Sequence, residues 1–368
     1  SMGAKVIPLG VVPTPAVAYL TRYYKADAGV VISASHNPCE YNGIKFFNSD
    51  GYKLSDGIEN EIESYILGEK AIEELPTHGK VGYVSANHNA VEDYVAFAVS
   101  TIDCRLDGMK IAVDCANGAS YETAFKALNK LGANVEAIHN TPDGVNINHM
   151  CGSTHMESLQ AYVTSIGADI GIAFDGDADR MLAVDENGNL IDGDQIMAAC
   201  AKFMRDNGTL KQNTLVATVM SNLGLFMAGE KIGINIPRTK VGDRYVLEEM
   251  LAKGYNIGGE QSGHIIFLDH NTTGDGLVSA LQFLSVLKKT GMKASEAASI
   301  VTVMPQVLRN AVVKLENKNS YMENEEIAAA CKALEDEFAG EGRVLIRPSG
   351  TEPLVRVMIE GKDEEYIT

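Results

Sequence analysis

Apolar and polar positions alternate along the chain in blocks that predict strands and helices in succession. The apolar run over residues 28–32 predicts a buried strand that ends at Ser33, and residues 43–47 predict a short second strand. Residues 55–68 have apolar positions at helical spacing opposite a charged face, which predicts a surface helix. A further helix is predicted near residues 90–101, so we expect the first part of the chain to be an α/β unit.

From Lys110 onward, a strand–helix–strand rhythm occurs twice. The first unit has a strand beginning at Lys110, a helix over residues 119–131 and a strand over residues 133–138. The second unit has a strand over residues 214–220, a helix from Ser221 and a strand over residues 233–237. This repetition predicts two related α/β domains in succession.

The pattern changes again near Met304 and Pro305. A strand is predicted over residues 309–313, a helix near residues 323–338, and two strands over residues 342–347 and 353–360. These elements predict a small α+β unit at the end of the chain.

Composition narrows the class of protein. With 368 residues, the chain is long enough for two to four domains, and 45% hydrophobic with 22% charged residues is typical of a soluble globular protein. The net charge of −18 argues against a nucleic-acid partner or an anionic membrane, and no apolar run approaches the ~20 residues that span a bilayer. The six cysteines are scattered without a C-x-x-C pair, which favours reduced thiols in a cytoplasmic protein.

The stretch V-I-S-A-S-H-N-P, residues 31–38, places polar groups on a loop at the end of the first predicted strand. Open α/β sheets present reactive residues at such strand ends. Ser35 offers a hydroxyl, and His36 beside it can move protons near neutral pH. A polar turn in which Pro38 simply ends the strand is the alternative interpretation, because turns favour the same residue types.

The stretch F-D-G-D-A-D-R, residues 174–180, places three aspartates at alternate positions. Asp175, Asp177 and Asp179 can direct their carboxylates at one hard divalent cation, and Mg²⁺ suits such a site. The spacing also resembles a calcium-binding EF-hand loop, but Arg180 stands where that loop needs glycine and the flanking residues predict strands. A solvated acidic turn is the other alternative.

Two further loops have ligand-binding character. In G-G-E-Q-S-G-H, residues 258–264, the glycines allow a ligand to approach the backbone, and Glu260 and Ser262 offer the acceptors and donors that sugar hydroxyls need. In R-P-S-G-T-E-P, residues 347–353, Arg347, two hydroxyls and the backbone amides near Gly350 would make a concave anion site. Each loop alone could also be an ordinary turn.

Together, the four loops supply a serine nucleophile, a magnesium site, a sugar-binding loop and a phosphate-binding loop. S-A-S-H-N-P, D-G-D-A-D-R, G-E-Q-S-G-H and R-P-S-G-T-E-P stand in the order and spacing of the α-D-phosphohexomutase superfamily, which the chain resembles over essentially its whole length. Gln261 favours the branch that acts on glucosamine phosphates. The alternatives are an enzyme acting on mannose or glucose phosphates, and a phosphosugar-binding protein without catalysis.

The resemblance implies a fold of three related α/β mixed-sheet domains, the first incomplete, plus a small α+β C-terminal domain around a central cleft. The expected domains are residues 3–104 with the phosphoserine loop, 105–207 with the Mg²⁺-binding loop, 208–304 with the sugar-binding loop and 305–368 with the phosphate-binding loop.

The resemblance also implies a mechanism, an intramolecular phosphotransfer that makes the enzyme an isomerase. Ser35 would carry a phosphoryl group and pass it to the phosphosugar substrate, giving a sugar bisphosphate that also serves as the activator. One Mg²⁺ per active site would be held by Ser35, Asp175, Asp177 and Asp179. His36 and Lys45 are the candidates for proton transfer, and Arg180 would touch a phosphate.

The substrate-binding residues that the resemblance implies come from two regions. In the third domain they are Lys240, Gly242, Asp243, Arg244, Glu260, Ser262 and His264. In the fourth domain they are Arg347, Ser349, Gly350, Thr351 and Arg356.

Relative to the family pattern, we expect two departures at the ends of the chain. A segment on the order of half a domain is expected ahead of Gly3, and a last helix is expected beyond Thr368. Without the first segment, apolar sheet surface and a strand edge should be exposed in the first domain. Members of the family are often homodimers through that domain.

Overall fold

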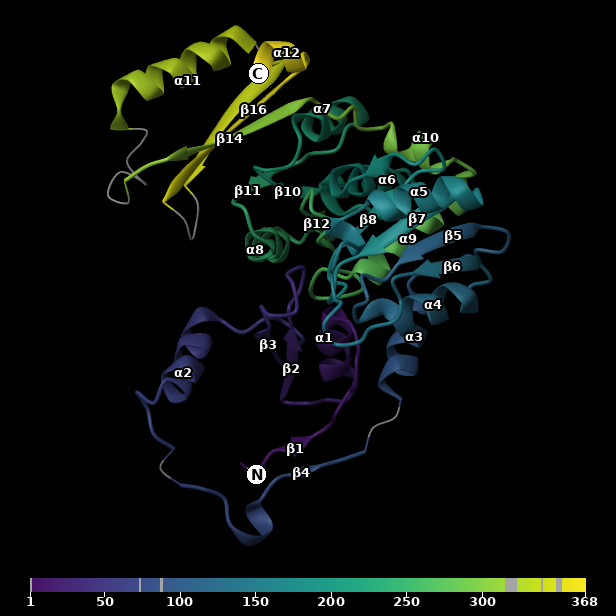
Figure 1. The fold of residues 1–368 in the computed structure, drawn as a ribbon, viewed down its shortest axis with the longest axis vertical. Helices are drawn as coiled ribbons and strands as arrows, with labels where there is room; N and C mark the ends of the chain where they lie inside the picture. Colours follow the sequence, from purple (N-terminus) through teal and green to yellow (C-terminus); the bar gives the residue numbers. More distant parts are fainter. Residues whose placement is uncertain (1, 73, 87–88, 315–322, 339, 349–352) are drawn as a thin grey trace. The chain divides into compact units, whose positions relative to one another are not determined.

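The structure is a computed structural model that describes residues 2–72, 74–86, 89–314, 323–338, 340–348 and 353–368. The chain forms two compact units (Figure 1). The first unit contains Ser1–Met220 and Ile234–Ile300, and the second contains Ser221–Gly233 and Val301–Thr368.

The described residues among the first hundred form two small sheets and three α-helices. The elements are β1 (Lys5–Val6), α1 (Thr14–Tyr23), β2 (Ala28–Ser33), β3 (Gly43–Asn48), α2 (Asp56–Ile66), the 3₁₀ turn η1 (His78–Lys80), β4 (Tyr83–Val84) and α3 (Ala90–Ser100). β1 pairs with β4 in parallel, and β2 pairs with β3 antiparallel. Pro15 lies in the first turn of α1, where its missing N–H costs no hydrogen bond.

A five-stranded mixed sheet follows, in the order β6-β5-β7-β8-β9. Its elements are β5 (Lys110–Asp114), α4 (Ser120–Lys130), β6 (Asn134–Ile138), η2 (Gly152–Thr154), α5 (Glu157–Ile166), β7 (Ile170–Phe174), β8 (Met181–Val184), β9 (Leu190–Ile191) and α6 (Gly193–Asp206). β5 pairs in parallel with β6 and β7, whereas β7–β8 and β8–β9 are antiparallel. Parallel strands at the centre of a sheet are buried on both faces, and β7 is buried along its whole length.

A four-stranded mixed sheet in the order β11-β10-β12-β13 repeats the arrangement of β6-β5-β7-β8. Its elements are η3 (Lys211–Asn213), β10 (Val216–Thr218), β11 (Arg238–Thr239), α8 (Asp243–Lys253), β12 (Ile257–Gly259), β13 (Ile265–Phe267), α9 (Gly276–Thr290) and α10 (Ala294–Ala298). Here too the first three strands are parallel and the last is antiparallel. The prediction of related mixed-sheet α/β domains is therefore confirmed.

The strand predicted over residues 233–237 is wrong in position. Gly233 is the left-handed residue that ends α7 (Leu223–Ile232), and the strand after it is β11, two residues long. Between them only Asn235 makes an isolated bridge, to Thr214. Pro237 lacks an N–H and cannot donate to a sheet ladder, so regular pairing begins after it.

The second unit contains an antiparallel sheet in the order β14-β16-β15. Its elements are α7, β14 (Gln306–Val312), α11 (Glu325–Phe338), β15 (Gly342–Pro348), β16 (Leu354–Gly361) and α12 (Glu364–Ile367). Glu360 is fully buried and forms an ion pair with Arg343. It also accepts hydrogen bonds from the backbone amide of Leu223, at 3.2 Å, and the side chain of Asn222, at 3.3 Å. The predicted small α+β unit is confirmed, and α7 belongs with it.

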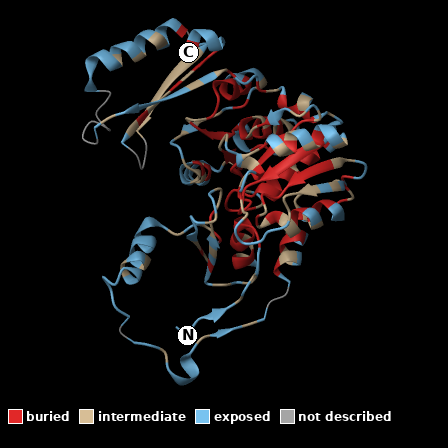
Figure 2. Cartoon of the chain, in the orientation of Figure 1, coloured by how far each residue is buried: buried red, intermediate tan, exposed pale blue. Residues whose placement is uncertain are grey.

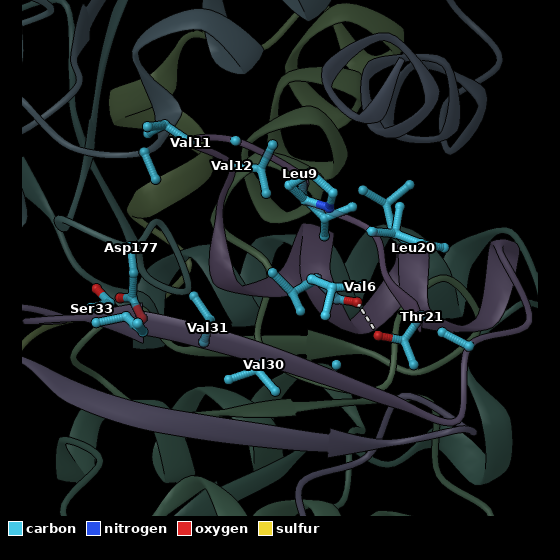
Figure 3. A pocket seen from close by; sticks show the side chains of 18 of the residues that line it. Val6, Leu9, Val11, Val12, Leu20, Thr21, Val30, Val31, Ser33 and Asp177 are labelled. Atoms are coloured by element: carbon cyan, nitrogen blue, oxygen red, sulfur yellow. Dashed lines mark hydrogen bonds between the residues drawn. The ribbon is translucent and has the colours of Figure 1, made fainter. Parts of the chain in front are cut away.

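Burial differs sharply between the sheets of the first unit (Figure 2). The strands β5, β7 and β8 are almost entirely buried, whereas Val30 and Ile32 on β2 are 52% and 71% exposed. A cavity of about 1330 Å³ lies between β1, α1 and β2, lined mostly by aliphatic side chains, with Ser33 and Asp177 among its lining residues (Figure 3).

Two predictions from composition can be compared with the structure. All six cysteines lie in the described part of the chain, and none of them forms a disulfide. Among the residues that the structure describes, no helix is both long and apolar enough to cross a bilayer.

Candidate active site

Three buried aspartates stand on the loop between β7 and β8. Asp175, Asp177 and Asp179 are 0%, 2% and 5% exposed. The loop is tightened by its own backbone, because the amide of Ala178 donates to the carbonyl of Asp175 at 3.0 Å and the amide of Arg180 donates to Asp175 Oδ1 at 3.1 Å. As a result, one oxygen from each aspartate lies within 4.8 Å of the other two.

The bonding of these carboxylates fits a divalent cation. Asp175 Oδ2, Asp177 Oδ1 and Asp179 Oδ1 are buried and have no hydrogen-bond partner among the described residues. A buried carboxylate oxygen without a partner is costly, and three of them together are paired or bound to a metal in stable proteins. Hard oxygen ligands carrying formal charge are the set that Mg²⁺ prefers. The residues present therefore fit a magnesium ion.

The electrostatics support the same conclusion. Burial and the neighbouring carboxylates of Asp179 and Asp177 raise the pKa of Asp175 well above its usual range. Burial acts to lower the pKa of the Lys45 ammonium, but Asp179 and Asp177 outweigh it and raise that pKa above its ordinary value. A bound cation would stabilise the charged form of all three carboxylates, as Lys45 does for two of them.

Lys45 and Thr14 fix Asp177 from the side of the first domain. Lys45 Nζ lies 2.6 Å from Asp177 Oδ2 and 3.4 Å from Asp179 Oδ2. The hydroxyl of Thr14 donates to the same Asp177 Oδ2 at 2.7 Å, and the amide of Thr14 donates to the carbonyl of Asp177 at 2.9 Å. Both side-chain donors use Oδ2, which leaves Oδ1 of Asp177 for a cation.

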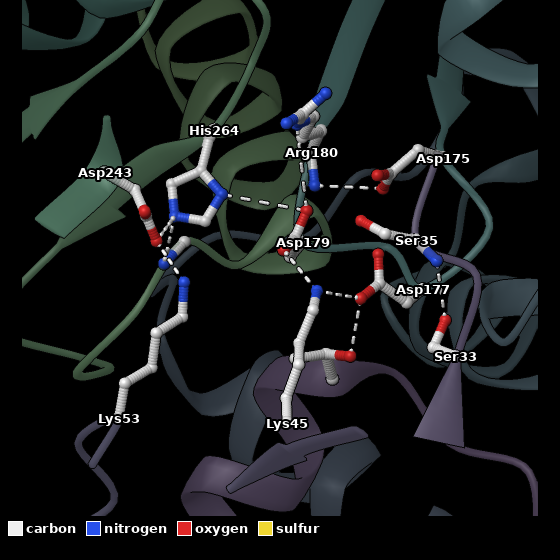
Figure 4. A network of polar contacts seen from close by, with 12 residues as sticks. Ser33, Ser35, Lys45, Lys53, Asp175, Asp177, Asp179, Arg180, Asp243 and His264 are labelled. Carbon is white, nitrogen blue, oxygen red and sulfur yellow. Dashed lines mark hydrogen bonds and ion pairs between the residues drawn. The ribbon is translucent and has the colours of Figure 1, made fainter. Parts of the chain in front are cut away.

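Ser35 stands on the loop that follows β2, beside the aspartates (Figure 4). It is half-buried and has a left-handed backbone with φ of 55°. For a residue other than glycine this conformation costs roughly 1–2 kcal/mol, and such strain collects at functional sites. The amide of Ser35 donates to the hydroxyl of Ser33 at 2.9 Å, so Ser33 is already used in shaping the loop.

His36 and Arg180 complete this side of the site. Burial lowers the pKa of His36, and the positive charge of Arg180 lowers it further, which favours a neutral imidazole. Nδ1 of His36 is buried without a hydrogen-bond partner in the described part of the chain. Nε of Arg180 lies 4.0 Å from Asp179 Oδ1, beyond hydrogen-bond reach. Both groups are therefore available to a ligand.

His264 links the aspartate loop to the third domain (Figure 4). Its Nδ1 lies 3.7 Å from Asp179 Oδ1, and its Nε2 lies 3.5 Å from Asp243 Oδ2. The amide of Gly274 donates to Nε2 at 3.2 Å, which places the ring proton on Nδ1, facing Asp179. Asp243 also forms an ion pair with Lys53 of the first domain.

Other residues predicted for the third domain have separate contacts. The amide of Gly242 donates to Glu260 Oε1 at 3.1 Å, which joins the loop at Gly242 to the predicted sugar-binding loop. Arg244 is exposed and pairs with Glu248 and Asp56. Lys240 stacks over Tyr245 at 5.7 Å, and Ser262 is exposed. In the described part of the chain, the contacts of Arg244 and Lys240 are with Glu248, Asp56 and Tyr245 rather than with the three aspartates.

Gln261, the residue that favoured the glucosamine branch, has a structural partner. Its side-chain amide donates to Asp192 Oδ2 at 3.0 Å, and Asp192 caps the start of α6. Gly193 follows this cap, and a Cβ added there would lie 2.3 Å from the carbonyl oxygen of Glu260. Gln261 thus fastens the predicted sugar-binding loop to α6.

The predicted phosphate-binding loop lies in the second unit. Arg347 and Arg356 stand directly opposite each other on β15 and β16. Burial and the charge of Arg356 lower the pKa of Arg347. Two guanidinium groups on neighbouring strands offer donors in the geometry that a phosphate group accepts, so the pair is suited to a phosphate. Ser349, Gly350 and Thr351 lie outside the described residues.

Two residues of the site were missed from the sequence, Thr14 and Lys53. Thr14 stands between two prolines at the start of α1, and Lys53 follows a turn without any motif. A polar residue between two prolines ahead of an apolar helix was the available signal for Thr14. Lys53 gave none.

Comparison with known proteins first shows the family and the fold to which the chain is similar. Four family models of phosphoglucomutase/phosphomannomutase match the chain: α/β/α domain I over residues 1–73, domain II over 91–188, domain III over 192–304 and the C-terminal domain over 311–368. A crystal structure of a phosphoglucomutase/phosphomannomutase family protein from Burkholderia thailandensis has a TM-score of 0.80 at 22% identity, covering 98% of this chain and 80% of that chain. N-acetylphosphoglucosamine mutase from Aspergillus fumigatus has a TM-score of 0.73 at 20% identity, covering 96% and 89%. These likenesses show the fold.

The curated relatives narrow the class further. Phosphoglucosamine mutase from Ruminiclostridium cellulolyticum is 63% identical over 368 residues, covering all of this chain and 82% of the relative. Phosphoglucosamine mutase from Clostridium acetobutylicum is 60% identical over 367 residues with the same coverage. The chain therefore belongs to the phosphoglucosamine mutases of the phosphoglucomutase/phosphomannomutase family, and it is an isomerase.

Proposed function

We propose that this protein interconverts glucosamine 6-phosphate and glucosamine 1-phosphate by passing a phosphoryl group through Ser35. The observation that carries the proposal is the placement of a strained, half-buried serine beside three aspartates that each have an orphaned oxygen. The choice of glucosamine phosphates as the substrate is supported by relatives at 58–63% identity that are named phosphoglucosamine mutase.

The exchange of bonds is symmetrical. The bond between phosphorus and the Ser35 oxygen breaks as the free hydroxyl of the phosphosugar forms a bond to the same phosphorus. The proton of that hydroxyl leaves, and the Ser35 oxygen gains a proton. The sugar bisphosphate then turns around and returns its original phosphoryl group to Ser35 by the reverse exchange. A bisphosphate lost midway must be supplied from outside, which makes a sugar bisphosphate the activator.

The proton carriers follow from the charges of the site. His36 is neutral, because burial and Arg180 lower its pKa, and it can accept the proton of the sugar hydroxyl. Asp177 and Asp179 hold Lys45 charged and raise its pKa, so it would stabilise negative charge more readily than it would give up a proton. The aspartates and Ser35 would hold one Mg²⁺, which when bound offsets negative charge on the phosphoryl group.

The rest of the substrate would be held by the other two loops. Glu260 and Asp243 offer acceptors for sugar hydroxyls, and His264, which lies between Asp179 and Asp243, would orient these carboxylates. Arg347 and Arg356 offer donors for the phosphate that is not reacting. The contact between Gln261 and Asp192 supports an indirect role for Gln261 in sugar choice, through the shape of its loop. The homodimer, the cytoplasmic location and the four domain boundaries stay predictions.

The test combines phosphate mapping with turnover. We expect phosphate on Ser35, loss of that phosphate in Ser35→Ala, and retention in the matched variant Ser33→Ala. In a coupled assay, we expect turnover of glucosamine phosphates to exceed that of glucose and mannose phosphates. A preference for glucose or mannose phosphates would overturn the substrate assignment. Sugar-phosphate binding without turnover, with Ser35 always bare, would instead show a binding protein.

A further inference from the structure

A loop of the second domain reaches the Ser35 loop, although no sequence motif marked it. We call residues 139–152, which follow β6, the strap. Both ends of the strap meet one carboxylate oxygen: Nδ1 of His139 lies 2.9 Å from Asp114 Oδ2, and the amide of Gly152 donates to the same oxygen at 3.0 Å. Asp114 is fully buried at the end of β5. The strap is therefore closed at its base.

Asn148 is the residue of the strap that touches the Ser35 loop. Its Nδ2 donates to the backbone carbonyls of Ser35 and Asn37, at 2.8 Å each. Its own amide donates to the carbonyl of Ala116 at 2.9 Å, and its backbone is left-handed with φ of 57°. Asparagine tolerates that conformation better than most residues. Asn148 is 6% exposed, so the two bonds are shielded from water.

Gly176, between Asp175 and Asp177, is the residue on which the Ser35 loop packs where Asn148 binds it. A Cβ added to Gly176 would lie 2.5 Å from the carbonyl oxygen of Ser35 and 2.7 Å from Asn148 Nδ2. The two loops therefore touch backbone to backbone at this point. Because Gly176 lies between two of the aspartates, the position of the Ser35 main chain is set directly against the candidate metal site.

We propose that Asn148 is a positioning residue for phosphoryl transfer, fixing the Ser35 loop against Gly176 so that the Ser35 oxygen meets the aspartate site. The inference rests on the proposed function of Ser35. Asn148 touches no reacting atom. The left-handed backbone of Ser35 is unfavourable and would relax to another conformation if nothing held it. The two N–H groups of the Asn148 side chain hold this main chain in place. Small displacements of a reacting group lower the rate without weakening binding.

The experiment uses the full chain and four variants. Asn148→Asp keeps size and shape but replaces both donors with acceptors, and Asn148→Gly keeps the left-handed backbone without a side chain. Asn146→Ala is the matched control, because Asn146 lies in the same strap and its side chain bonds Thr141 at 3.1 Å rather than the Ser35 loop. Gly176→Ala tests the contact from the other side. The readouts are phosphate uptake by Ser35 from glucose 1,6-bisphosphate in a single turnover, kcat and KM separately, Mn²⁺ affinity and hydrogen exchange of residues 33–38.

We expect both Asn148 variants to lose about 10–100-fold in uptake rate and kcat, with KM and Mn²⁺ affinity within twofold and faster exchange over residues 33–38. Gly176→Ala should also lower the uptake rate and speed the exchange of residues 33–38, and Asn146→Ala should resemble the wild type. If the wild type takes up phosphate on Ser35 and both Asn148 variants do so equally fast, the inference is wrong while the proposed function stands. If the wild type takes up none, the proposed function fails and the inference with it.

Discussion

Two clusters in this molecule each bring three potential metal ligands within 4.8 Å of one another, and they differ in what those ligands already bind. Asp175, Asp177 and Asp179 each have a buried oxygen without a hydrogen-bond partner among the described residues. In the cluster of Asp114, His139 and Cys151, both oxygens of Asp114 already have partners. Oδ1 accepts a hydrogen bond from the amide of Ala116, and Oδ2 contacts both ends of the strap.

The difference shows that proximity alone does not define a metal site. Asp114 needs no cation, because backbone amides and an imidazole satisfy its charge. Burial raises the pKa of the Cys151 thiol to about 12, which keeps it protonated and a poor ligand. The aspartate trio is the opposite case, with charge that the protein leaves unsatisfied. The cluster of Asp114 holds a loop in place, whereas the aspartate trio has the unsatisfied charge of a ligand site.

The largest expected effect is loss of the metal site. Asp177→Asn removes the formal charge that a hard cation needs, and we expect turnover to fall by at least about 100-fold together with Mn²⁺ affinity. Calorimetric titration and the coupled assay measure the two quantities. Asp114→Asn is the matched control for metal binding and should leave Mn²⁺ affinity unchanged. Equal affinity in the two variants would show that the trio is only an acidic turn.

The next largest effect should show that the cluster of Asp114 stabilises the fold rather than binding a metal. Asp114→Ala leaves the buried amides of Ala116 and Gly152 without acceptors, so the free energy of unfolding should fall by about 1–3 kcal/mol. Denaturant unfolding gives the value, and Mn²⁺ titration of the folded variant should match the wild type. Weaker Mn²⁺ binding with unchanged stability would reverse the roles of the two clusters.

A smaller effect is expected at the partner of Asp177. Thr14→Val keeps the shape of the side chain but removes the hydroxyl that orients the carboxylate, and Mn²⁺ affinity should fall about tenfold. Thr21→Val is the control, because the Thr21 hydroxyl bonds Val17 within its own helix. A loss of the same size in both variants would point to damage to α1 rather than to the metal site.

The smallest effect is a pH dependence at the base of the strap. Asp114 raises the pKa of His139, so the pair stabilises the fold fully below the ordinary histidine pKa, and the contribution is lost as pH rises through the raised value. The gap in melting temperature between wild type and His139→Gln should therefore narrow between pH 6 and pH 9. The change should correspond to less than about 1 kcal/mol, because the ring is partly exposed. A gap that widens with pH would contradict the assignment.

The parts of the site that were predictable are those in which neighbouring residues in the sequence act together. Asp175, Asp177 and Asp179 alternate within five residues, and their spacing alone indicated one cation. Thr14 acts on Asp177 across 163 positions, and nothing local to either residue records the contact. The role of Asn148 could not be predicted from the sequence either, because its side chain bonds distant main-chain carbonyls rather than a particular side chain.

The fold was predictable to a similar degree. Repeated strand–helix–strand patterns indicated related sheets, and both sheets have the same strand order. The strand over residues 233–237 was misplaced, because Pro237 lacks an N–H and regular pairing begins only after it, at β11. The membership of α7 in the second unit was not predictable, since that depends on Glu360.

The second unit is built from two separate stretches of the chain, and this has a consequence for its synthesis on the ribosome. Asn222 and its partner Glu360 are 138 positions apart, and α7 emerges long before the sheet it belongs with. At roughly 5–20 residues per second, α7 waits on the order of ten seconds for β16. During that interval the buried face of α7, including Leu225 and Phe226, has no native cover from residues 301–368. A trigger-factor type of chaperone should therefore crosslink to nascent chains stalled between residues 260 and 350, and release them once Glu360 has left the exit tunnel.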